Sequence, residues 1–282
     1  MKKLLLCALA VSVACAENQP GTDTTNASAA ASGPQEMTIT SRDFAFTGPD
    51  TVNPGLTRIR YVNEGPNLHH AFLIRLTEGK TLADFGAAMQ SMKPGDPFPS
   101  WATDAGGPNP VEIGKEAVVT QELHPGTYAL ICVVDIPDKV PHVMKGMSTS
   151  FVVRDAPAVA ATPPTADVTM TLADYQFGLS TPLTAGKHVI KIDNAATQPH
   201  EVLLFRLDDG KTPEDFGKWG ADYKGPPPGK VMGGVAPFTG SESLYLEVDL
   251  TPGNYLLVCF VPDAKDGKAH LEHGMIMPIT IG

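Results

Sequence analysis

Residues 125–132 read Pro-Gly-Thr-Tyr-Ala-Leu-Ile-Cys, and residues 252–259 read Pro-Gly-Asn-Tyr-Leu-Leu-Val-Cys. In both segments the Pro-Gly pair predicts a turn, and the aromatic and aliphatic residues behind it predict a buried strand that leads to a single cysteine. One octapeptide therefore occurs twice, far apart in the chain, which indicates an internal duplication.

The duplication extends outward from these two strands. Residues 63–76 align without gaps on residues 194–207. Two shorter matches lie between the blocks: Asp84-Phe85-Gly86 with Asp215-Phe216-Gly217, and Gly106-Gly107 with Gly233-Gly234. Two repeats of nearly 120 residues indicate a duplicated domain, because a solenoid has shorter and more numerous units.

An Ala-, Pro- and Thr-rich stretch has linker composition and separates the two repeats. The sequence therefore predicts this organisation: a signal peptide over 1–15, a flexible tether over 16–35, a first domain over 36–154, a linker over 155–166 and a second domain over 167–282.

Each repeat reads mainly as β-structure. Leu244, Leu246, Val248 and Leu250 alternate with polar or aromatic residues, as in a strand with one buried face. One helix is expected in each repeat, because Thr81 and Thr212 are suitable N-cap residues with an aspartate three positions on. Short strands and frequent turn signals predict an all-β fold of two tandem Greek-key β-sandwiches, each with one short helix.

Composition narrows the possible functions. The 282 residues are 42% hydrophobic and 18% charged, which is enough for two ordinary cores. The formal net charge is −10, and the 21 basic residues form no run, so a nucleic-acid partner is not expected. Four cysteines are too few for a disulfide scaffold.

The N-terminus has the features of an export signal. Lys2 and Lys3 precede an apolar run over 4–13, which is too short to span a bilayer. Residues 11–15, Val-Ser-Val-Ala-Cys, resemble a bacterial lipobox, whereas Ala14-Cys15-Ala16 also fits ordinary signal removal. The polar tether behind this site favours the first alternative. We therefore predict lipidation at Cys15, membrane attachment through that lipid, and a location in the bacterial cell envelope.

Potential metal ligands occur at matching places in the two repeats. In chain order they are His69, Cys132, His142 and Met147, and then His200, Cys259, His270 and Met275. Two imidazoles, one thiolate and one weak thioether suit a mononuclear blue-copper site. A lone buried cysteine or histidine is more often structural, but the recurrence of four ligand types in one order favours a metal site. His70 follows His69 but faces the other side of the strand, and its counterpart is Glu201, so His70 is assigned a structural or surface role.

Both repeats resemble cupredoxins of the plastocyanin and pseudoazurin type. The resemblance rests on Gln198-Pro199-His200, on the Pro-Gly-x-Tyr-x-x-x-Cys strand, and on the His-x4-Met loop. It implies one copper per domain that cycles between Cu(I) and Cu(II), electron transfer in the envelope, and a redox partner protein. One feature departs from the family, in which two to four residues separate the cysteine from the second histidine. Here nine residues separate Cys132 from His142, and ten separate Cys259 from His270.

Two-domain copper oxidases and nitrite reductases belong to the same group and must be considered. Their additional metal centres use histidines beside the cysteine or in His-x-His pairs, and this sequence has neither. The sequence therefore predicts that the protein is not an enzyme. Three functions stay open: an electron carrier, a copper-trafficking or storage protein, and a metal-free cupredoxin-like binding module. A visible thiolate-to-copper absorption band distinguishes the first two from the third.

Overall fold

The computed structural model describes residues 33–93, 96–135, 138–240 and 242–282. The predicted signal peptide, Cys15 and most of the predicted tether lie outside these residues. No helix in the described part of the chain is long and apolar enough to cross a membrane.

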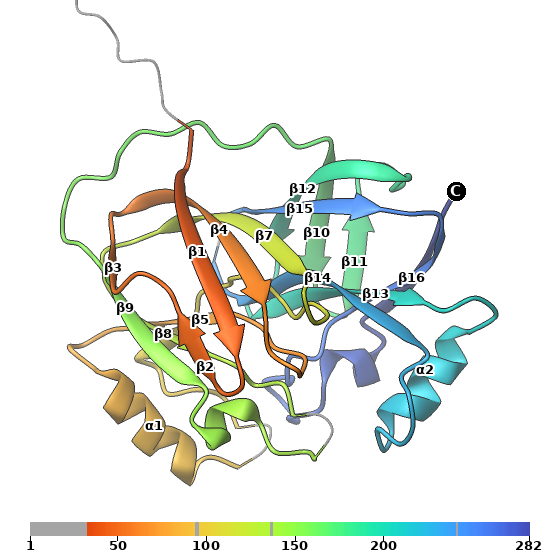
Figure 1. The fold of residues 1–282 in the computed structure, drawn as a ribbon, viewed down its shortest axis with the longest axis horizontal. Coiled ribbons are helices and arrows are strands. Elements are labelled where there is room, and N and C mark those ends of the chain that lie inside the picture. The colour runs from red at the N-terminus through yellow and green to blue at the C-terminus, as the bar shows by residue number, and fades with distance from the viewer. Residues whose placement is uncertain (1–32, 94–95, 136–137, 241) are drawn as a thin grey trace, which may run out of the picture. The chain divides into compact units, whose positions relative to one another are not determined.

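The chain folds into two halves, residues 35–153 and 168–281, with similar element orders (Figure 1). The first half contains β1 (Gln35–Arg42), β2 (Ala45–Thr47), β3 (Thr51–Val52), β4 (Gly55–Asn63), β5 (Phe72–Leu76), α1 (Leu82–Ser91), β6 (Ala102–Asp104), β7 (Glu116–Leu123), β8 (Gly126–Ile131), the 3-10 helix η1 (His142–Lys145) and β9 (Ser148–Val153). The second half contains β10 (Val168–Ala173), β11 (Gln176–Leu179), β12 (Gly186–Asn194), β13 (His200–Leu207), α2 (Pro213–Gly220), β14 (Gly229–Phe238), β15 (Leu244–Leu250), β16 (Gly253–Val258), the 3-10 helix η2 (His270–His273) and β17 (Ile276–Ile281).

Three sheets hold these strands. An eight-stranded sheet has the order β11-β10-β12-β15-β7-β4-β1-β2 and takes four strands from each half. A five-stranded sheet, β3-β9-β8-β5-β6, belongs to the first half, and a four-stranded sheet, β14-β13-β16-β17, belongs to the second. The strand-rich prediction with two α-helices is confirmed for the described residues. The sheets do not divide into two separate sets, however, because β7 pairs with β15.

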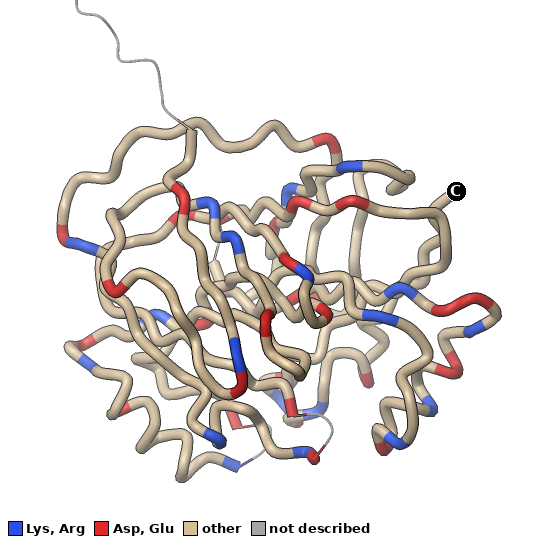
Figure 2. Tube along the Cα trace, viewed as in Figure 1, with Lys and Arg blue, Asp and Glu red and all other residues tan. Residues whose placement is uncertain are grey.

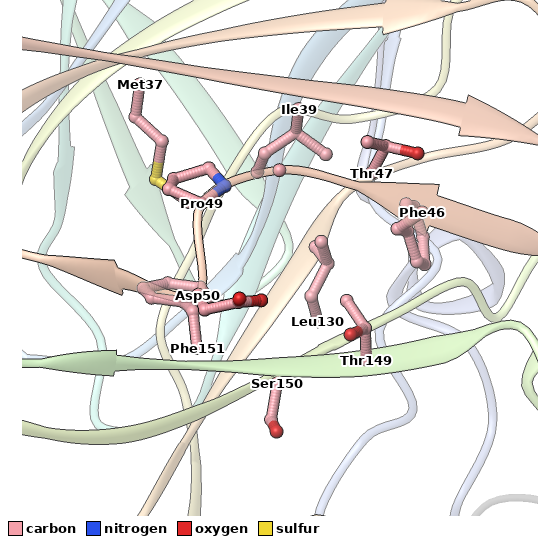
Figure 3. A pocket seen from close by; sticks show the side chains of 11 residues that line it. Met37, Ile39, Phe46, Thr47, Pro49, Asp50, Leu130, Thr149, Ser150 and Phe151 are labelled. Carbon is pink, nitrogen blue, oxygen red and sulfur yellow. The ribbon is translucent and has the colours of Figure 1, made fainter.

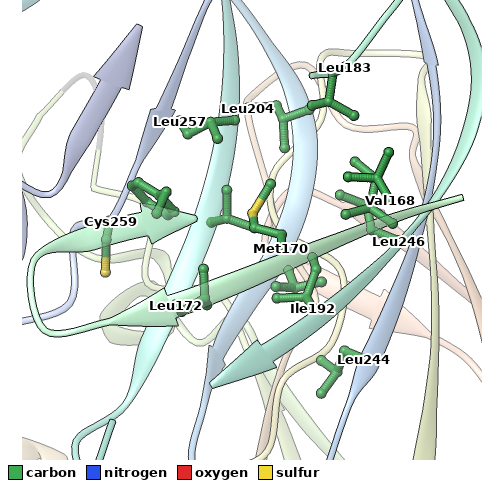
Figure 4. Close-up of a cluster of buried hydrophobic side chains, with 14 of the residues drawn as sticks. Val168, Met170, Leu172, Leu183, Ile192, Leu204, Leu244, Leu246, Leu257 and Cys259 are labelled. Atoms are coloured by element: carbon green, nitrogen blue, oxygen red, sulfur yellow. The ribbon is translucent and has the colours of Figure 1, made fainter. Parts of the chain in front are cut away.

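Successive side chains of a strand point to opposite faces of its sheet, and this alternation shows where the cores lie. On β8, Tyr128 and Leu130 pack with Ile39 and Ile59 of the eight-stranded sheet, whereas Ile131 packs on the opposite face. The second half repeats this pattern: Leu257 and Cys259 belong to the inner cluster, and Leu256 to the outer one. Figure 4 shows Cys259 at one side of the inner cluster of the second half. Each cysteine therefore lies on the inner face, at the end of a buried strand.

Both predicted helices form, and they begin where the sequence indicates. The Thr81 side chain accepts a hydrogen bond from the backbone of Asp84, and the Asp84 carboxylate accepts one from the Thr81 backbone. Thr212 and Asp215 form the same reciprocal capping box. Phe85 and Phe216 are the buried residues of the two helices and join the outer cores.

The two halves join through equivalent elements. β7 pairs antiparallel with β15, its counterpart in the repeat. The segment around Gly107 pairs with the segment around Gly234: Ala236 N–H donates to Gly107 O at 2.8 Å, and Asn109 N–H donates to Gly234 O at 3.1 Å. Contacts between like segments are what a two-fold arrangement of two repeats produces. The domain boundaries stay a prediction.

Charged residues and one hollow can be placed on the described part of the chain. Lys and Arg are scattered over the described elements and interspersed with Asp and Glu (Figure 2). A hollow of about 220 Å³ opens beside β1, β2 and β9, and Met37, Phe46 and Phe151 contribute to its lining (Figure 3). The hollow is lined by no histidine or cysteine.

Candidate metal centres

Three predicted ligands of the first half lie together. The Cys132 Sγ lies 3.8 Å from the Nδ1 of His69 and 3.6 Å from the Nδ1 of His142, and the two Nδ1 atoms are 2.9 Å apart. All three side chains are buried. Residues separated by up to 73 positions in the sequence thus present three donor atoms to one point.

The second half repeats this arrangement. The Cys259 Sγ lies 3.9 Å from the Nδ1 of His200 and 3.4 Å from the Nδ1 of His270. The two imidazole rings have centroids 4.5 Å apart, against 4.7 Å in the first half. In each half, the three donor atoms lie within 4.8 Å of one another.

Backbone hydrogen bonds join the beginning and the end of the loop between each cysteine and the second histidine. These bonds bring the histidine back to the cysteine. Past β8, Val143 N–H donates to Cys132 O at 2.7 Å and His142 N–H donates to Val134 O at 2.9 Å. Equivalent bonds clamp the second loop: Leu271 N–H donates to Cys259 O, and His270 N–H donates to Val261 O. The two ends of each loop therefore lie side by side. The greater length of the loop does not move the histidine away from the cysteine.

A carboxylate orients the first histidine of each group. The Nε2 of His69 lies 2.6 Å from the Asp43 carboxylate, and the Nε2 of His200 lies 3.1 Å from the Asp174 carboxylate. Because a carboxylate accepts hydrogen bonds, it fixes the ring proton on Nε2 and leaves a lone pair on Nδ1, the atom that faces the thiol. A carboxylate that orients a histidine in this way is typical of metal-ligating histidines.

Burial sets the protonation states of the donors. It raises the pKa of the Cys132 thiol to about 12, and it also raises that of Cys259. It lowers the pKa of His142 and that of His270 to about 4, and the neighbouring imidazole adds to the effect in each case. At neutral pH, the metal-free groups are therefore neutral imidazoles beside a thiol, and a metal must displace the thiol proton.

The sulfur–nitrogen separations fit a tetrahedral or trigonal metal site, whereas the 2.9 Å between the Nδ1 atoms of His69 and His142 is a hydrogen-bond distance, shorter than the about 3.3 Å that such a site gives two nitrogens. With metal bonds of about 2.0 Å to nitrogen and about 2.3 Å to sulfur, such a site separates these donors by about 3.5 to 3.7 Å. The observed Sγ–Nδ1 separations of 3.4 to 3.9 Å bracket this range. One thiolate with two imidazoles is a donor set of the softness that copper prefers. The two groups therefore indicate copper binding.

The predicted methionine ligands lie next to these donors. Met147 and Met275 are fully buried. Met147 O accepts a hydrogen bond from Cys132 N–H, and Met147 N–H donates to His142 O at 3.0 Å; Met275 makes the equivalent bonds. The glycine before each methionine has a φ above 90°, which ends the 3-10 helix and turns the methionine inward. Ligation by either sulfur stays a prediction.

Sequence reasoning missed the residues around the donors. Besides Asp43 and Asp174, it missed Phe44 and Tyr175, whose rings lie 5.1 Å from His142 and 5.5 Å from His270, respectively. A signal was available, because Asp43-Phe44-Ala45-Phe46 matches Asp174-Tyr175-Gln176-Phe177. Carboxylate and aromatic residues recurring at one spacing could have been read as support for the ligands.

Comparison with known proteins finds similar solved structures at low sequence identity. No protein-family model and no curated protein matches the sequence. Among solved structures, a reduced auracyanin from Roseiflexus castenholzii is 22% identical, with a TM-score of 0.28, over 44% of this chain and 99% of its own. Auracyanin A from Chloroflexus aurantiacus, described as a blue copper protein, is 23% identical, with a TM-score of 0.30, over 43% of this chain and 100% of its own. The resemblance to cupredoxins is confirmed, and the likeness concerns the fold alone.

Other matches correct the prediction that the protein is not an enzyme. The copper nitrite reductase of Nitrosomonas europaea aligns over 88% of this chain and 93% of its own, with 13% identity and a TM-score of 0.26. A multicopper oxidase, a laccase and a second nitrite reductase also align over most of the chain. The exclusion was wrong because it considered only histidines beside the cysteine and His-x-His pairs. Those patterns do not reveal a likeness that extends through both halves.

Proposed function

We propose that this chain carries up to two mononuclear copper centres and transfers single electrons through them. The observation that carries the proposal is the orientation of the first histidines, whose Nδ1 lone pairs face a buried thiol in both halves. In this proposal each half is a Greek-key sandwich, with His69, Cys132 and His142 as the strong ligands of the first centre. His200, Cys259 and His270 would have that role in the second, and Met147 and Met275 would supply the weak thioether ligands.

When bound, copper supplies a one-electron couple between Cu(I) and Cu(II). The chain supplies a site that does not need to rearrange between these states. Cys132 and Cys259 are held by strands of the inner cores, and the histidines are fixed by the loop-base hydrogen bonds and by Asp43 and Asp174. Burial keeps water from the donors, and this favours a stable thiolate–metal bond.

Titration of the reduced, metal-free protein with Cu(II) tests the proposal. We expect two equivalents to bind and to produce an intense visible band, and we expect ascorbate to bleach the band reversibly. Cys132→Ser and Cys259→Ser should each remove about half of the absorbance, because the two sites use separate ligands, and the double variant should be colourless. Absence of copper uptake by protein with reduced thiols would contradict the proposal and favour a metal-free binding module.

The same protein distinguishes the uses of the centres. Tight copper binding without reversible reduction would favour a trafficking or storage role. Rapid reoxidation by O₂ or by nitrite, with turnover, would assign the electron-transfer centres to an enzyme. Reversible cycling with a protein acceptor, without turnover of either small molecule, supports an electron carrier with a redox partner.

We also propose export and lipid attachment at Cys15. The basic and apolar N-terminal residues and the polar tether support this location. Cys15→Ser should release the protein from the membrane fraction of a bacterial host. A mature wild-type N-terminus without a lipid, determined by mass spectrometry, would contradict the proposal.

A further inference from the structure

A second group of potential metal donors lies in the second half, in the segment between Cys259 and the end of η2. Its members are Asp263, Asp266 and His273, and their donor atoms all lie within 4.8 Å of one another. The Nε2 of His273 lies 3.1 Å from the Oδ1 of Asp266. None of the three is a proposed copper ligand, so the second copper centre does not explain why they lie together.

The spacing and chemistry of these donors suit one small divalent ion. Tetrahedral coordination by zinc separates an oxygen donor from a nitrogen donor by about 3.3 Å. The 3.1 Å between Asp266 and His273 is a little shorter, because a hydrogen bond joins these two side chains. Since no separation in the group exceeds 4.8 Å, ligation needs only small rotations of the side chains. Three protein donors, with water in the remaining position, form the kind of open site that zinc occupies.

Asp263 is a buried carboxylate without a cationic partner. Its side chain is only 2% exposed. Its oxygens accept hydrogen bonds from three neutral donors: the Tyr175 hydroxyl at 2.5 Å, the Gln198 Nε2 at 3.2 Å and the Lys265 N–H at 2.8 Å. In the described part of the chain, no lysine or arginine side chain pairs with it. Because a buried charge is costly unless an opposite charge balances it, Asp263 indicates a cation that the chain itself does not supply.

The His270 ring points independently to the same place. Its side chain is fully buried, and its Nε2 has no hydrogen-bond partner among the described residues. The Nδ1 of this ring faces the Cys259 thiol, so the neutral ring carries its proton on Nε2. The nearest carboxylate oxygen, Oδ2 of Asp263, is 3.8 Å away, which is too far for a direct hydrogen bond. A water molecule coordinated to an ion on Asp263 would accept this hydrogen bond.

The equivalent place in the first half holds a positive charge of the chain itself. Lys145 and Asp138 occupy the positions of His273 and Asp266 in the repeat. The Nζ of Lys145 lies 2.9 Å from the Oδ1 of Asp138, and it also lies over the Phe44 ring. In the second half an imidazole replaces this ammonium group, and the carboxylates are kept. A divalent ion would restore the positive charge that the substitution removes.

We propose that Asp263, Asp266 and His273 bind one divalent cation of the zinc type, in the place that the Lys145 ammonium group fills in the first half. This site does not depend on the proposed function, because copper uses other donors. The ion replaces the hydrogen atom between His273 and Asp266, and the imidazole keeps its proton on Nδ1. Bound there, the ion balances the Asp263 carboxylate and fixes the loop that carries the second histidine of the centre.

Zinc binding to the full-length protein tests the site. The protein is freed of metal with a chelator, kept reduced, and dialysed against micromolar Zn(II). Because the cysteine–histidine groups can also take zinc, the quantity measured is the difference in zinc content between variants. We expect His273→Lys to bind one zinc ion fewer per chain than the wild type, because lysine removes a donor and supplies an ammonium group. Equal zinc content in the two proteins would overturn the proposal and leave the copper proposal intact.

His124→Lys is the matched control. His124 also pairs with a carboxylate, at 2.8 Å from Glu242, but it belongs to none of the donor groups found among the described residues. The same substitution there should leave the zinc content at the wild-type value. A loss of one zinc ion in this control as well would show that the effect of lysine is not specific to the site, and would overturn the assignment to His273.

Crystals of the zinc-loaded protein locate the ion. We expect an anomalous peak at the zinc edge between Asp263, Asp266 and His273, about 2.0 to 2.2 Å from each donor atom. This peak should vanish in His273→Lys while any peaks at the cysteine–histidine groups stay. Peaks at the cysteine–histidine groups alone in the wild type would overturn the site.

If His273→Lys does not fold, Asp266→Asn is the second variant. The Asp266 side chain is 38% exposed, and the amide oxygen of asparagine can still accept the hydrogen bond from Lys268 N–H. The fold is therefore kept while a charged ligand is lost. We expect the affinity of the site for zinc to fall at least tenfold, as measured by competition with a chelator. An affinity equal to that of the wild type would overturn the proposal.

Discussion

The two centres share their donors and backbone but differ in the residues just outside. Over the first centre, Phe44 contacts His142, and Lys145 lies over the Phe44 ring while it pairs with Asp138. Over the second, Tyr175 packs on His270 and His273, and its hydroxyl donates to Asp263. An ammonium group at the rim of one centre is thus replaced by an imidazole at the other.

The two centres also differ in the buried side chain beside the cysteine. The bond from the residue after the cysteine is accepted by an imidazole in the first half and by a carboxylate in the second. The duplicated ligands have therefore been kept while their electrostatic surroundings diverged. Hydrogen bonds and charges around a copper thiolate tune its reduction potential, so we expect two centres of the same geometry and different potential. The predictions below test where the halves behave alike and where they do not.

The largest effect is expected at the glycines that join the halves. A Cβ on Gly234, which has a φ of 142°, would lie 1.9 Å from Val202 O, and one on Gly107 would lie 2.3 Å from Ala71 O. Gly234→Ala should lower the free energy of unfolding by about 3 to 5 kcal/mol, and Gly107→Ala by somewhat less. Urea denaturation measures both. Gly86→Ala, on a helix with open space around it, is the control and should be neutral or slightly stabilising. Equal, small effects at all three glycines would contradict the close approach of the strands.

The second prediction concerns acid. In the folded protein the pKa of His142 and that of His270 are lowered from 6.5 to about 4. Between these values the unfolded chain binds protons that the folded chain does not, so the stability of the metal-free protein should fall as the pH falls from 6.5 to 4. Each imidazole contributes a slope of at most about 1.4 kcal/mol per pH unit. Thermal unfolding across this range measures the slope. His142→Asn and His270→Asn should flatten it equally, and unequal changes would place the difference between the centres in the second histidines.

Smaller changes are expected at the carboxylates. Asp43→Asn and Asp174→Asn keep the side-chain shape but weaken the bond that orients the first histidine, which should lower copper affinity by about 10- to 100-fold. We expect the larger loss at Asp43, because its contact is shorter, 2.6 against 3.1 Å, and its side chain is 24% exposed against 47%. Competition with a chelator of known copper affinity measures each constant. Equal losses would show that the two contacts are equivalent in solution.

The strand-rich fold and the grouping of histidines with a cysteine in each half could be predicted because they leave patterns in the sequence. The strands before Cys132 and Cys259 and the capping boxes at Thr81 and Thr212 can each be read from a short stretch of sequence. The ordered ligand set is spread over a longer stretch and can be read only from its recurrence in the two repeats. The merging of strands from both halves could not, because the edges of β7 and β15 carry ordinary alternating residues. Pairing between strand edges uses backbone groups that every sequence has.

The shared backbone contact of His70 and Glu201 was missed for a related reason. The matching positions of His70 and Glu201 were visible in the repeat, but an imidazole and a carboxylate at one position read as divergence. Their common role appears only when both side chains are seen to accept the same backbone hydrogen bond. Asn109 left no signal, because its partners lie in the other repeat.

The smallest effects are expected at the axial positions, where the two halves can be compared most directly. Met147 and Met275 are both fully buried, and both are fixed by the same backbone bonds to the cysteine and the second histidine. Leucine has a similar volume, so Met147→Leu and Met275→Leu should each cost less than about 1.5 kcal/mol in stability. An axial thioether is a weak ligand, and its loss should change copper affinity by less than about tenfold.

The reduction potential is the sharper measurement for these variants. A thioether donates more to the oxidised metal than to the reduced one, so its removal should raise the potential of the affected centre only. The backbone hydrogen bonds around the two methionines match. We therefore expect the reduction potentials of the two centres to rise by equal amounts, although the starting potentials differ. A shift in one half alone would show that only that methionine approaches the metal. No shift in either half would mean that both sulfurs only fill space in the core, and the centres would then have three ligands each.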